Sequence, residues 1–489
     1  GGAALSEGVA SAASAAASPS SAASTASASS RRTAEAEPKD APRNVLGRAA
    51  DYIDLVVSGS EPETWTRNFR VMSMCMGVAH CAEDLLFVYT MSVYPPETSR
   101  RCNNLMLASW SLVALLVAPG AMERVGSKAA IVLGLLLYCL QYCMMPNAWD
   151  TGMHDDWEIR ALAFLGSISC GAGAGLVWTA EGVFFAESAR RVAAATGEPL
   201  ESKTTGLAAV FGVWSLGTEC AVKVVGHVCL KAGFTTKKLF VSSLLLAFMA
   251  TGATSFARPV HDTDAASGGG RCRRRLEALV MWADARIWLL SFLTVGFRLI
   301  VSLVQITIGY DFVRPIVGHD VMMLLSALSA GVGALMQMPL RRAAGRFGNA
   351  GNMALGSLAV VAAGALMLAS DMQSIGLWFL AFYVVRGVIR GIWETTYMAV
   401  VANHFPDSAS KAAFANLNMQ AAISACLAWC LRIDLSDPLY CAMVVAVGCA
   451  IMPGFLGASM LQGARKDGAE QSSGNDKQDE RDGRAHESV

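Results

Sequence analysis

Charged side chains recur at regular intervals within an otherwise apolar sequence. Between Trp65 and Leu461 the chain has about twelve apolar stretches, each near the length that a membrane-spanning helix needs. The first, fourth, seventh and tenth stretches contain charges: Glu83 and Asp84, then Glu181, then Arg298, and then Arg386, Arg390 and Glu394. An ionisable group at membrane depth is costly unless it faces water or a partner. We therefore expect these groups to line one shared polar cavity.

The first and seventh stretches carry opposite charges at comparable depth. An arginine beside an acid keeps both groups charged. We therefore predict an ion pair between Arg298 and either Asp84 or Glu83. The alternative is a structural lock with no role in binding, because buried ion pairs can serve specificity instead of stability.

Glu181 is the candidate for binding a proton or a cation. It follows a run of small residues, Gly171, Gly173 and Gly175, that permits close helix contact. Neutralising this carboxylate would favour a conformational change around it. The alternative is that Glu181 only forms hydrogen bonds.

Two stretches carry charged residues at every fourth position, so that each set forms one helix face. These residues are Arg386, Arg390 and Glu394 in the tenth stretch, and Glu219, Lys223 and His227 in the fifth. Arginines facing a cavity would bind an anionic solute. Pairing within each helix, Arg390 with Glu394 and Glu219 with Lys223, explains the pattern equally well and needs no ligand. We favour this structural interpretation for the fifth stretch.

The bulk composition is that of a membrane protein with many spans. Of the 489 residues, 54% are hydrophobic and 16% are charged, and the mean hydropathy is +0.41. Soluble domains contain roughly 25% charged residues. The formal net charge is zero and no basic stripe is present, so nothing indicates nucleic-acid binding.

The cysteines fit neither a disulfide framework nor a zinc spacing, and no nucleophile motif occurs. We therefore expect no enzyme activity, no metal site and no cofactor.

The stretches are predicted to be the helices of an all-α protein that crosses the lipid bilayer about twelve times. The predicted spans are 69–93, 104–122, 128–146, 160–184, 204–230, 239–257, 287–310, 320–340, 353–370, 375–400, 411–432 and 438–461. Connections after even-numbered spans are mostly basic, and basic residues favour the cytoplasmic side. We therefore expect both termini in the cytoplasm.

The two ends of the chain have polar or low-complexity composition. Residues 1–64 begin with an Ala/Ser-rich tail, predicted to be disordered, and apolar residues at helical spacing over 45–57 predict a short surface helix. The tail also has the Ser-rich, acid-poor composition of an organelle transit peptide. Residues 462–489 are predicted to form a disordered polar tail.

A weak repeat divides the spans into two halves. The segment from Met122 to Lys128 resembles the one from Arg342 to Gly348, and Trp178–Glu181 resembles Trp393–Thr396. The basic segment 258–286 would be a cytoplasmic linker between six-helix halves at 65–257 and 287–461. Parallel halves of this kind are typical of the major facilitator fold, whose substrate site lies between them.

Two motifs resemble one branch of that superfamily, the Unc-ninety-three-like ion-channel regulatory proteins. The run from Gly171 to Gly182 is similar to a glycine-rich fourth span that ends in Leu-Trp-x-x-Gln-Gly. Residues 390–395, 403–406 and 412–420 are similar to that branch's tenth and eleventh spans. The chain departs from the pattern at Glu181, where the branch has Gln, at Glu394, where it has Asn, and at Arg390, which lies near its acidic position.

The resemblance also implies a cytoplasmic gate at the turns before the third and ninth spans. The candidate gate residues are Gly126, Lys128, Arg342, Arg346 and Gly348, together with Arg124. A plain topology signal from basic loops explains the basic members of this set almost as well.

These observations leave two functions open. The first is a secondary transporter that moves a small polar or ionic solute by alternating access, with protons or a cation as the coupling ion. The second follows from the resemblance: a non-transporting accessory subunit that regulates an ion channel or escorts another membrane protein. Intramembrane titratable residues favour the transporter, because an escort needs no charged cavity.

Overall fold

All regular elements that the structure describes are helices. The computed structural model describes residues 62–144, 157–260, 277–369, 376–406, 409–430 and 438–486. The helices are α2 (Pro62–Val93), α3 (Pro96–Leu112), η1 (Val113–Val117), α4 (Ala118–Cys143), α5 (Trp157–Thr196), α6 (Leu200–Lys231), α7 (Thr236–Thr254), α9 (Glu277–Val280), η3 (Met281–Ala283), α10 (Ala285–Leu303), η4 (Val304–Val313), α11 (Arg314–Val317), α12 (His319–Ala369), η5 (Gly376–Trp378), α13 (Phe379–Trp393), α14 (Thr396–His404), α15 (Ala409–Cys430) and α16 (Pro438–His486). The predicted tail and surface helix before Pro62 lie outside the described residues.

The predicted membrane spans coincide with these helices, although α5 and α16 continue well beyond the predicted ends at 184 and 461. Among the described residues, seven helices are long and apolar enough to cross a membrane. Two of them contain two predicted spans each. The segment from Val321 to Ala369, for example, includes nearly all of both 320–340 and 353–370 and is interrupted between them at Gly348. The all-helical fold with many spans is therefore confirmed.

Glycines reverse the chain inside two of the long helices. Gly126 in α4 has φ 82° and ψ 162°, and Gly348 in α12 has φ 63° and ψ −171°. This region of backbone conformation is essentially restricted to glycine, because a Cβ atom would clash there. Each glycine thus ends one span and starts the next at a position predicted to be a gate turn.

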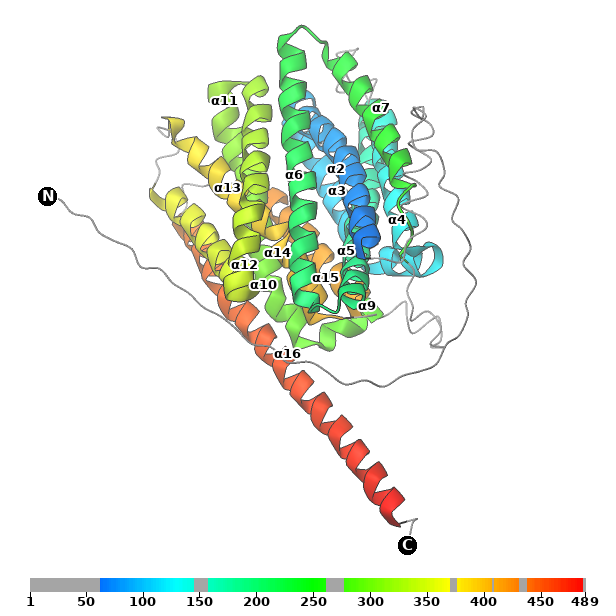
Figure 1. Cartoon of the computed structure of the whole chain (residues 1–489). Coiled ribbons are helices and arrows are strands. Elements are labelled where there is room, and N and C mark those ends of the chain that lie inside the picture. Colours follow the sequence, from blue (N-terminus) through cyan, green and yellow to red (C-terminus); the bar gives the residue numbers. More distant parts are fainter. Residues whose placement is uncertain are drawn as a thin grey trace, which may run out of the picture. The chain divides into compact units, whose positions relative to one another are not determined.

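Contacts between helices far apart in the sequence hold the bundle together. Helix α6 packs along α12, and α15 packs against α3 and α5. Figure 1 shows α6 and α12 side by side through most of the bundle. These pairs join the first six spans to the last six, and a continuous apolar core runs through both sets. Together these contacts bring the charged spans α2, α5, α10 and α13 around one region.

The glycine run of α5 permits close helix contact, as its composition predicts. A Cβ atom added at Gly173 would lie 2.6 Å from the carbonyl oxygen of Gly134 in α4. At Gly175 it would lie 2.8 Å from the backbone nitrogen of Ala114 in η1. Helix α5 therefore packs tightly between α4 and η1 at this level.

The C-terminal region differs from the composition-based expectation. Helix α16 continues to His486, so most of the segment predicted to be a disordered tail is helical. The segment predicted to be a linker contains the short helix α9, which packs against α15. The division of the chain at 258–286 stays a prediction.

Candidate functional site

A cavity of about 170 Å³ lies between the helices of the two halves. Its walls come from α2, α3, α4, α5, α10, η4, α13 and α15. The charged residues that line it are Asp84, Arg298, Arg386, Arg390 and Glu394. The aromatic residues that line it are His80, Trp110, Tyr138, Trp178, Trp393 and Trp429. The structure thus brings together side chains from distant parts of the sequence.

The cavity lies toward the end of the bundle where α2 terminates at Val93. On α2, α10 and α15 the lining residues come from the middle or the later part of each helix. At the opposite end, called the Pro62 end below, the halves are in direct contact. There Thr204 Oγ1 of α6 donates to Asn403 Oδ1 of α14 at 3.1 Å. A Cβ atom at Gly182 would overlap the Phe414 ring of α15. The cavity is therefore closed at the Pro62 end.

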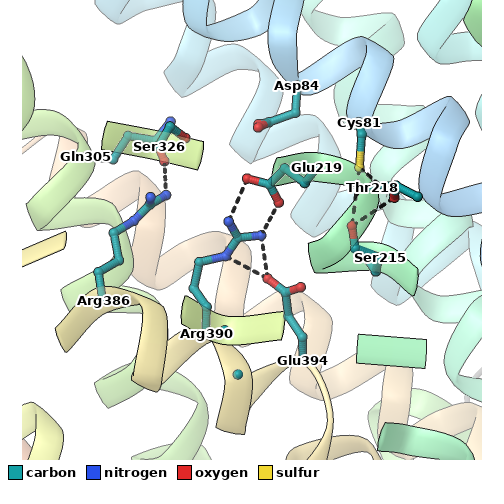
Figure 2. Close-up of polar contacts among 12 residues, drawn as sticks. Cys81, Asp84, Ser215, Thr218, Glu219, Gln305, Ser326, Arg386, Arg390 and Glu394 are labelled. Atoms are coloured by element: carbon teal, nitrogen blue, oxygen red, sulfur yellow. Dashed lines mark hydrogen bonds and ion pairs between the residues drawn. The ribbon is translucent and has the colours of Figure 1, made fainter. Parts of the chain in front are cut away.

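Arg390 of α13 joins the two halves through a bidentate ion pair. Its Nη1 and Nη2 donate to the two carboxylate oxygens of Glu219 in α6 at 2.7 and 2.6 Å. Its Nε also donates to Glu394 Oε1 at 2.8 Å. Figure 2 shows the Arg390 guanidinium between these two carboxylates. Paired N–H donors that match a carboxylate are among the strongest hydrogen-bonded contacts in proteins.

Lys223 extends this network to α2. It is 1% exposed and forms ion pairs with Asp84 and with Glu219, the latter at 2.6 Å. It also donates to Ser326 Oγ of α12 at 2.7 Å. Asp84, Lys223, Glu219, Arg390 and Glu394 therefore form one chain of alternating charges, called the ionic chain below. A buried charge is tolerated when it is paired in this way.

Asp84 forms its ion pair with Lys223 and lies within electrostatic range of Arg298, its predicted partner. A pair of Arg298 with Glu83 stays a prediction. The guanidinium of Arg298 lies 5.1 Å from the ring centre of Trp110 in α3. Its Nε is buried and has no hydrogen-bond partner among the described residues. Glu83 lies on the same helix as Asp84, but its side chain is outside the described set.

Arg386 lies one turn before Arg390 on α13 and is 4% exposed. Its Nη2 donates to Gln305 Oε1 at 2.9 Å, as Figure 2 shows. Its Nε is buried and has no acceptor among the described residues. Arg386 and Arg298 thus differ from Arg390, which contacts two carboxylates.

Glu181 lies beside the cavity and is not part of its lining. The side chain is 2% exposed, and Oε1 has no hydrogen-bond partner in the described part of the chain. It lies within electrostatic range of Glu394, whose Oε2 also lacks a partner there. Two neighbouring carboxyl groups therefore each have one buried oxygen available for a proton.

The predicted gate residues take different environments. Gly126 and Gly348 form the reversals described above, and Lys128 Nζ donates to the Ser255 carbonyl oxygen at 2.8 Å. Arg342 and Arg346 are exposed on α12. A joint role for these residues in gating stays a prediction.

Sequence reasoning missed the central place of Glu219 and Lys223. Their spacing of four residues was visible, and their in-helix pair is present. The missed information was that the same face of α6 points toward α2 and α13. Gln305 was missed as well, since no charge distinguishes it. Trp178 and Trp393, which the sequence singles out only as parts of the repeat, both line the cavity.

Comparisons with known proteins identify the family of this chain and solved structures with a similar fold. A sequence profile described as Major Facilitator Superfamily matches residues 104–428. A variant of the E. coli fucose:proton symporter FucP is similar in structure, with a TM-score of 0.56 and 13% identity over 81% of this chain and 98% of that chain. The xylose transporter XylE from E. coli, in a partially occluded inward-open conformation, gives a TM-score of 0.52 and 12% identity over 83% and 97%. No curated protein matches the chain by sequence.

Proposed function

Because this chain belongs to the Major Facilitator Superfamily, we propose that it is a secondary transporter of a small polar or ionic solute that works by alternating access. It is an integral membrane protein with many spans. The observation that carries the proposal is the cavity between the halves, which five charged side chains line. Charged groups at membrane depth are costly and mark solute or ion pathways.

The ionic chain allows the contact between the two halves to form and break during transport. Glu219 and Arg390 hold the halves together, and each has a second partner on its own helix, Lys223 and Glu394. When α6 and α13 separate, neither residue is left as an unpaired buried charge. Stranding one charge of a buried pair costs about 3–5 kcal/mol. The in-helix partners remove most of this penalty, so the halves can rock apart and close again.

We place the coupling proton at the neighbouring carboxyl groups of Glu181 and Glu394. A proton on either group would remove the repulsion between them and fill one unsatisfied oxygen. Its uptake or release would change the charge at the base of the cavity. The cost of opening the Pro62 end would then depend on whether the proton is bound.

A Glu181→Gln variant tests this assignment. Gln keeps the shape and the hydrogen-bonding capacity of Glu but does not titrate. We expect the variant to bind solute and to lose the pH dependence of transport. Unaltered pH dependence in proteoliposomes would show that Glu181 only forms hydrogen bonds. Glu97→Gln, which removes an exposed acid in the first turn of α3, is the matched control.

The resemblance to the Unc-ninety-three-like branch supports a second candidate, an accessory subunit of a channel or of another membrane protein. The two functions differ in what the isolated chain does. A transporter moves solute alone, whereas an accessory subunit co-purifies with a stoichiometric partner and moves none.

The deciding experiment is reconstitution of the purified chain in liposomes that contain a pH-sensitive dye. A pool of small anions, sugars and amino acids is added outside, and uptake is followed by mass spectrometry. We expect accumulation of one or a few solutes together with a pH change inside. Absence of both, with a partner bound in the native membrane, would favour the accessory role.

We also propose that both termini lie in the cytoplasm, because the turns at the Pro62 end are rich in basic residues. Labelling of an Arg346→Cys variant with a membrane-impermeant thiol reagent tests this. We expect labelling only after the cells are opened, measured against a parallel sample without the introduced cysteine.

A further inference from the structure

The cavity contains more cationic than anionic groups. Among the described residues that line it, three are arginines and two are carboxylates. Both carboxylates are already engaged, Asp84 by Lys223 and Glu394 by Arg390. Arg390 is held between Glu219 and Glu394. The excess positive charge therefore lies on Arg298 and Arg386.

These two guanidinium groups contact no carboxylate in the described part of the chain. Arg386 has a neutral partner, Gln305, and Arg298 lies over the face of Trp110. In each the Nε donor is buried without an acceptor. A guanidinium carries five N–H donors in a planar fork that matches a carboxylate. Unused donors on buried arginines indicate a binding site for an anion.

Electrostatics favour the same ligand. Arg298 lies within electrostatic range of Arg390 and Arg386, which repel it, and of Glu394 and Asp84, whose carboxylates are paired with Arg390 and Lys223. The three arginines come from α10 and α13, two helices that contact each other and both line the cavity. An anion between them would relieve the repulsion and supply the missing acceptors.

The rest of the described lining includes several aromatic side chains. Trp393 stacks on Tyr397 with ring centres 4.4 Å apart, which fixes the orientation of its indole. Trp178 is fixed by an edge contact with His80 at 4.9 Å. Both indoles line the cavity and are partly exposed. Fixed aromatic faces of this kind bind a flat ring at little entropic cost.

The spacing along α13 separates a cationic group of the cavity from an aromatic one. Arg386 and Trp393 are seven residues apart and lie on one face of the helix, about 10 Å apart along its axis. A ligand that contacts both must carry its charge and its ring on a short connecting chain.

We propose that the cavity binds an organic anion in which a carboxylate and an aromatic ring are joined by a short aliphatic chain. The carboxylate lies between Arg298 and Arg386, and the ring lies against Trp393. This assignment rests on the proposed function, because it names the solute class of the same cavity.

The test measures binding to the purified full chain in detergent, which does not require transport. The probes are 3-phenylpropanoate, 3-cyclohexylpropanoate, 3-phenylpropan-1-ol and 3-phenylpropylammonium. These molecules change the charge or the ring and keep the size. Calorimetry is expected to show the tightest binding for 3-phenylpropanoate, with the alcohol at least about tenfold weaker, since hydrogen bonds to charged groups are worth that much or more. Equal binding of the alcohol or the ammonium compound, or no binding of 3-phenylpropanoate, would overturn the proposal.

Variants then locate the site. Arg386→Gln and Arg298→Gln are each expected to weaken 3-phenylpropanoate about ten- to a hundredfold and to leave binding of the alcohol unchanged. Arg70→Gln, which removes an exposed arginine of α2, is the matched control. Arg386→Lys retains the charge without the fork and replaces Arg386→Gln if that variant fails to fold. Unchanged 3-phenylpropanoate binding in the folded variants would contradict the assignment.

A Trp393→Leu variant tests the ring contact, with Trp393→Phe as its conservative counterpart. We expect Leu to abolish the preference for 3-phenylpropanoate over 3-cyclohexylpropanoate and Phe to restore it. A preference that survives in the Leu variant would exclude Trp393 as the ring partner.

The proposal on the solute class and the proposal on transport can be refuted independently of each other. Binding of 3-phenylpropanoate without flux in liposomes would refute transport and keep the anion site. Flux of a different solute without binding of this anion would refute the solute class and keep transport.

Discussion

At the scale of single residues, spacing along one helix could be interpreted correctly, whereas contacts between helices could not. Residues four apart on a helix are neighbours whatever the tertiary structure. The pairs Arg390–Glu394 and Glu219–Lys223 were therefore predictable, and both are present. Which residue Asp84 contacts depends on how α2 and α6 are rotated toward each other, and no pattern in one sequence encodes that rotation.

The ion pair between Glu219 and Arg390 gives the first prediction. Arg390→Gln leaves Glu394 without its cation, so we expect a loss of about 3–5 kcal/mol in the free energy of unfolding. Glu219→Gln is expected to be destabilising as well. The double variant should lose less free energy of unfolding than the sum of the two single losses, because the residues contact each other.

The measurement is an unfolding titration in mixed micelles of detergent and SDS. Arg70→Gln is the control and should change stability by less than about 0.5 kcal/mol. Additivity of the two single effects would contradict a direct interaction between Glu219 and Arg390.

Asp284, which precedes the first turn of α10, gives a prediction on pH. Burial acts to raise its pKa, but hydrogen bonds from Arg286 at 2.7 to 3.2 Å outweigh burial, and Arg465 adds a further contact at 3.0 Å. The pKa of Asp284 therefore lies below its ordinary value. A lowered folded-state pKa contributes stability above the unfolded-state pKa, and this stability is lost as the pH falls through the folded value.

We accordingly expect the melting temperature of the natural chain to fall between neutral and strongly acidic pH, and to fall less in Asp284→Asn. Thermal unfolding of both proteins across this range measures the difference. Glu97→Gln, which removes an exposed acid of α3, is the matched control. Parallel pH curves for the natural chain and Asp284→Asn would exclude Asp284 as a contributor.

At the scale of elements, the predicted spans were found because length and apolar composition determine which segments cross a bilayer. The turns at Gly126 and Gly348 were also found, because glycine and basic residues interrupt the apolar pattern there. The helical extension of α16 to His486 was not found. Its composition is polar and charged, which resembles a disordered segment as closely as it resembles a solvated helix.

The two reversals predict opposite effects of alanine at neighbouring glycines. A Cβ atom at Gly126 meets nothing within 4 Å, so the cost of Gly126→Ala comes from the backbone alone, about 1–3 kcal/mol. Gly120 lies in the regular part of the same helix and is equally uncrowded. Gly120→Ala should stabilise the chain by up to about 1 kcal/mol.

Gly348 and Gly345 form a second matched pair on α12, and the same opposite signs are expected there. Unfolding titrations of the four single variants provide the comparison. Equal effects at the reversal glycines and at the helical glycines would mean that these conformations are not required.

At the scale of the whole molecule, the regular recurrence of charges predicted a single shared site, and five of the seven predicted residues line one cavity. Glu181 lies just behind the wall. The recurrence was informative because the cost of burying charge applies to every span alike. The sequence could not indicate which residues link the halves, since the charges of Glu219 and Lys223 are explained equally well by pairing within their own helix.

The measurement that tests alternating access most directly is solute uptake by a chain whose Pro62 end is cross-linked. Thr204 and Asn403 contact each other across the halves at 3.1 Å, and opening that end must separate them. In the Thr204→Cys/Asn403→Cys double variant, oxidation should abolish uptake in proteoliposomes and a reductant should restore it. Each single-cysteine variant should transport under both conditions. Undiminished uptake while mass spectrometry shows the 204–403 disulfide formed would contradict the account.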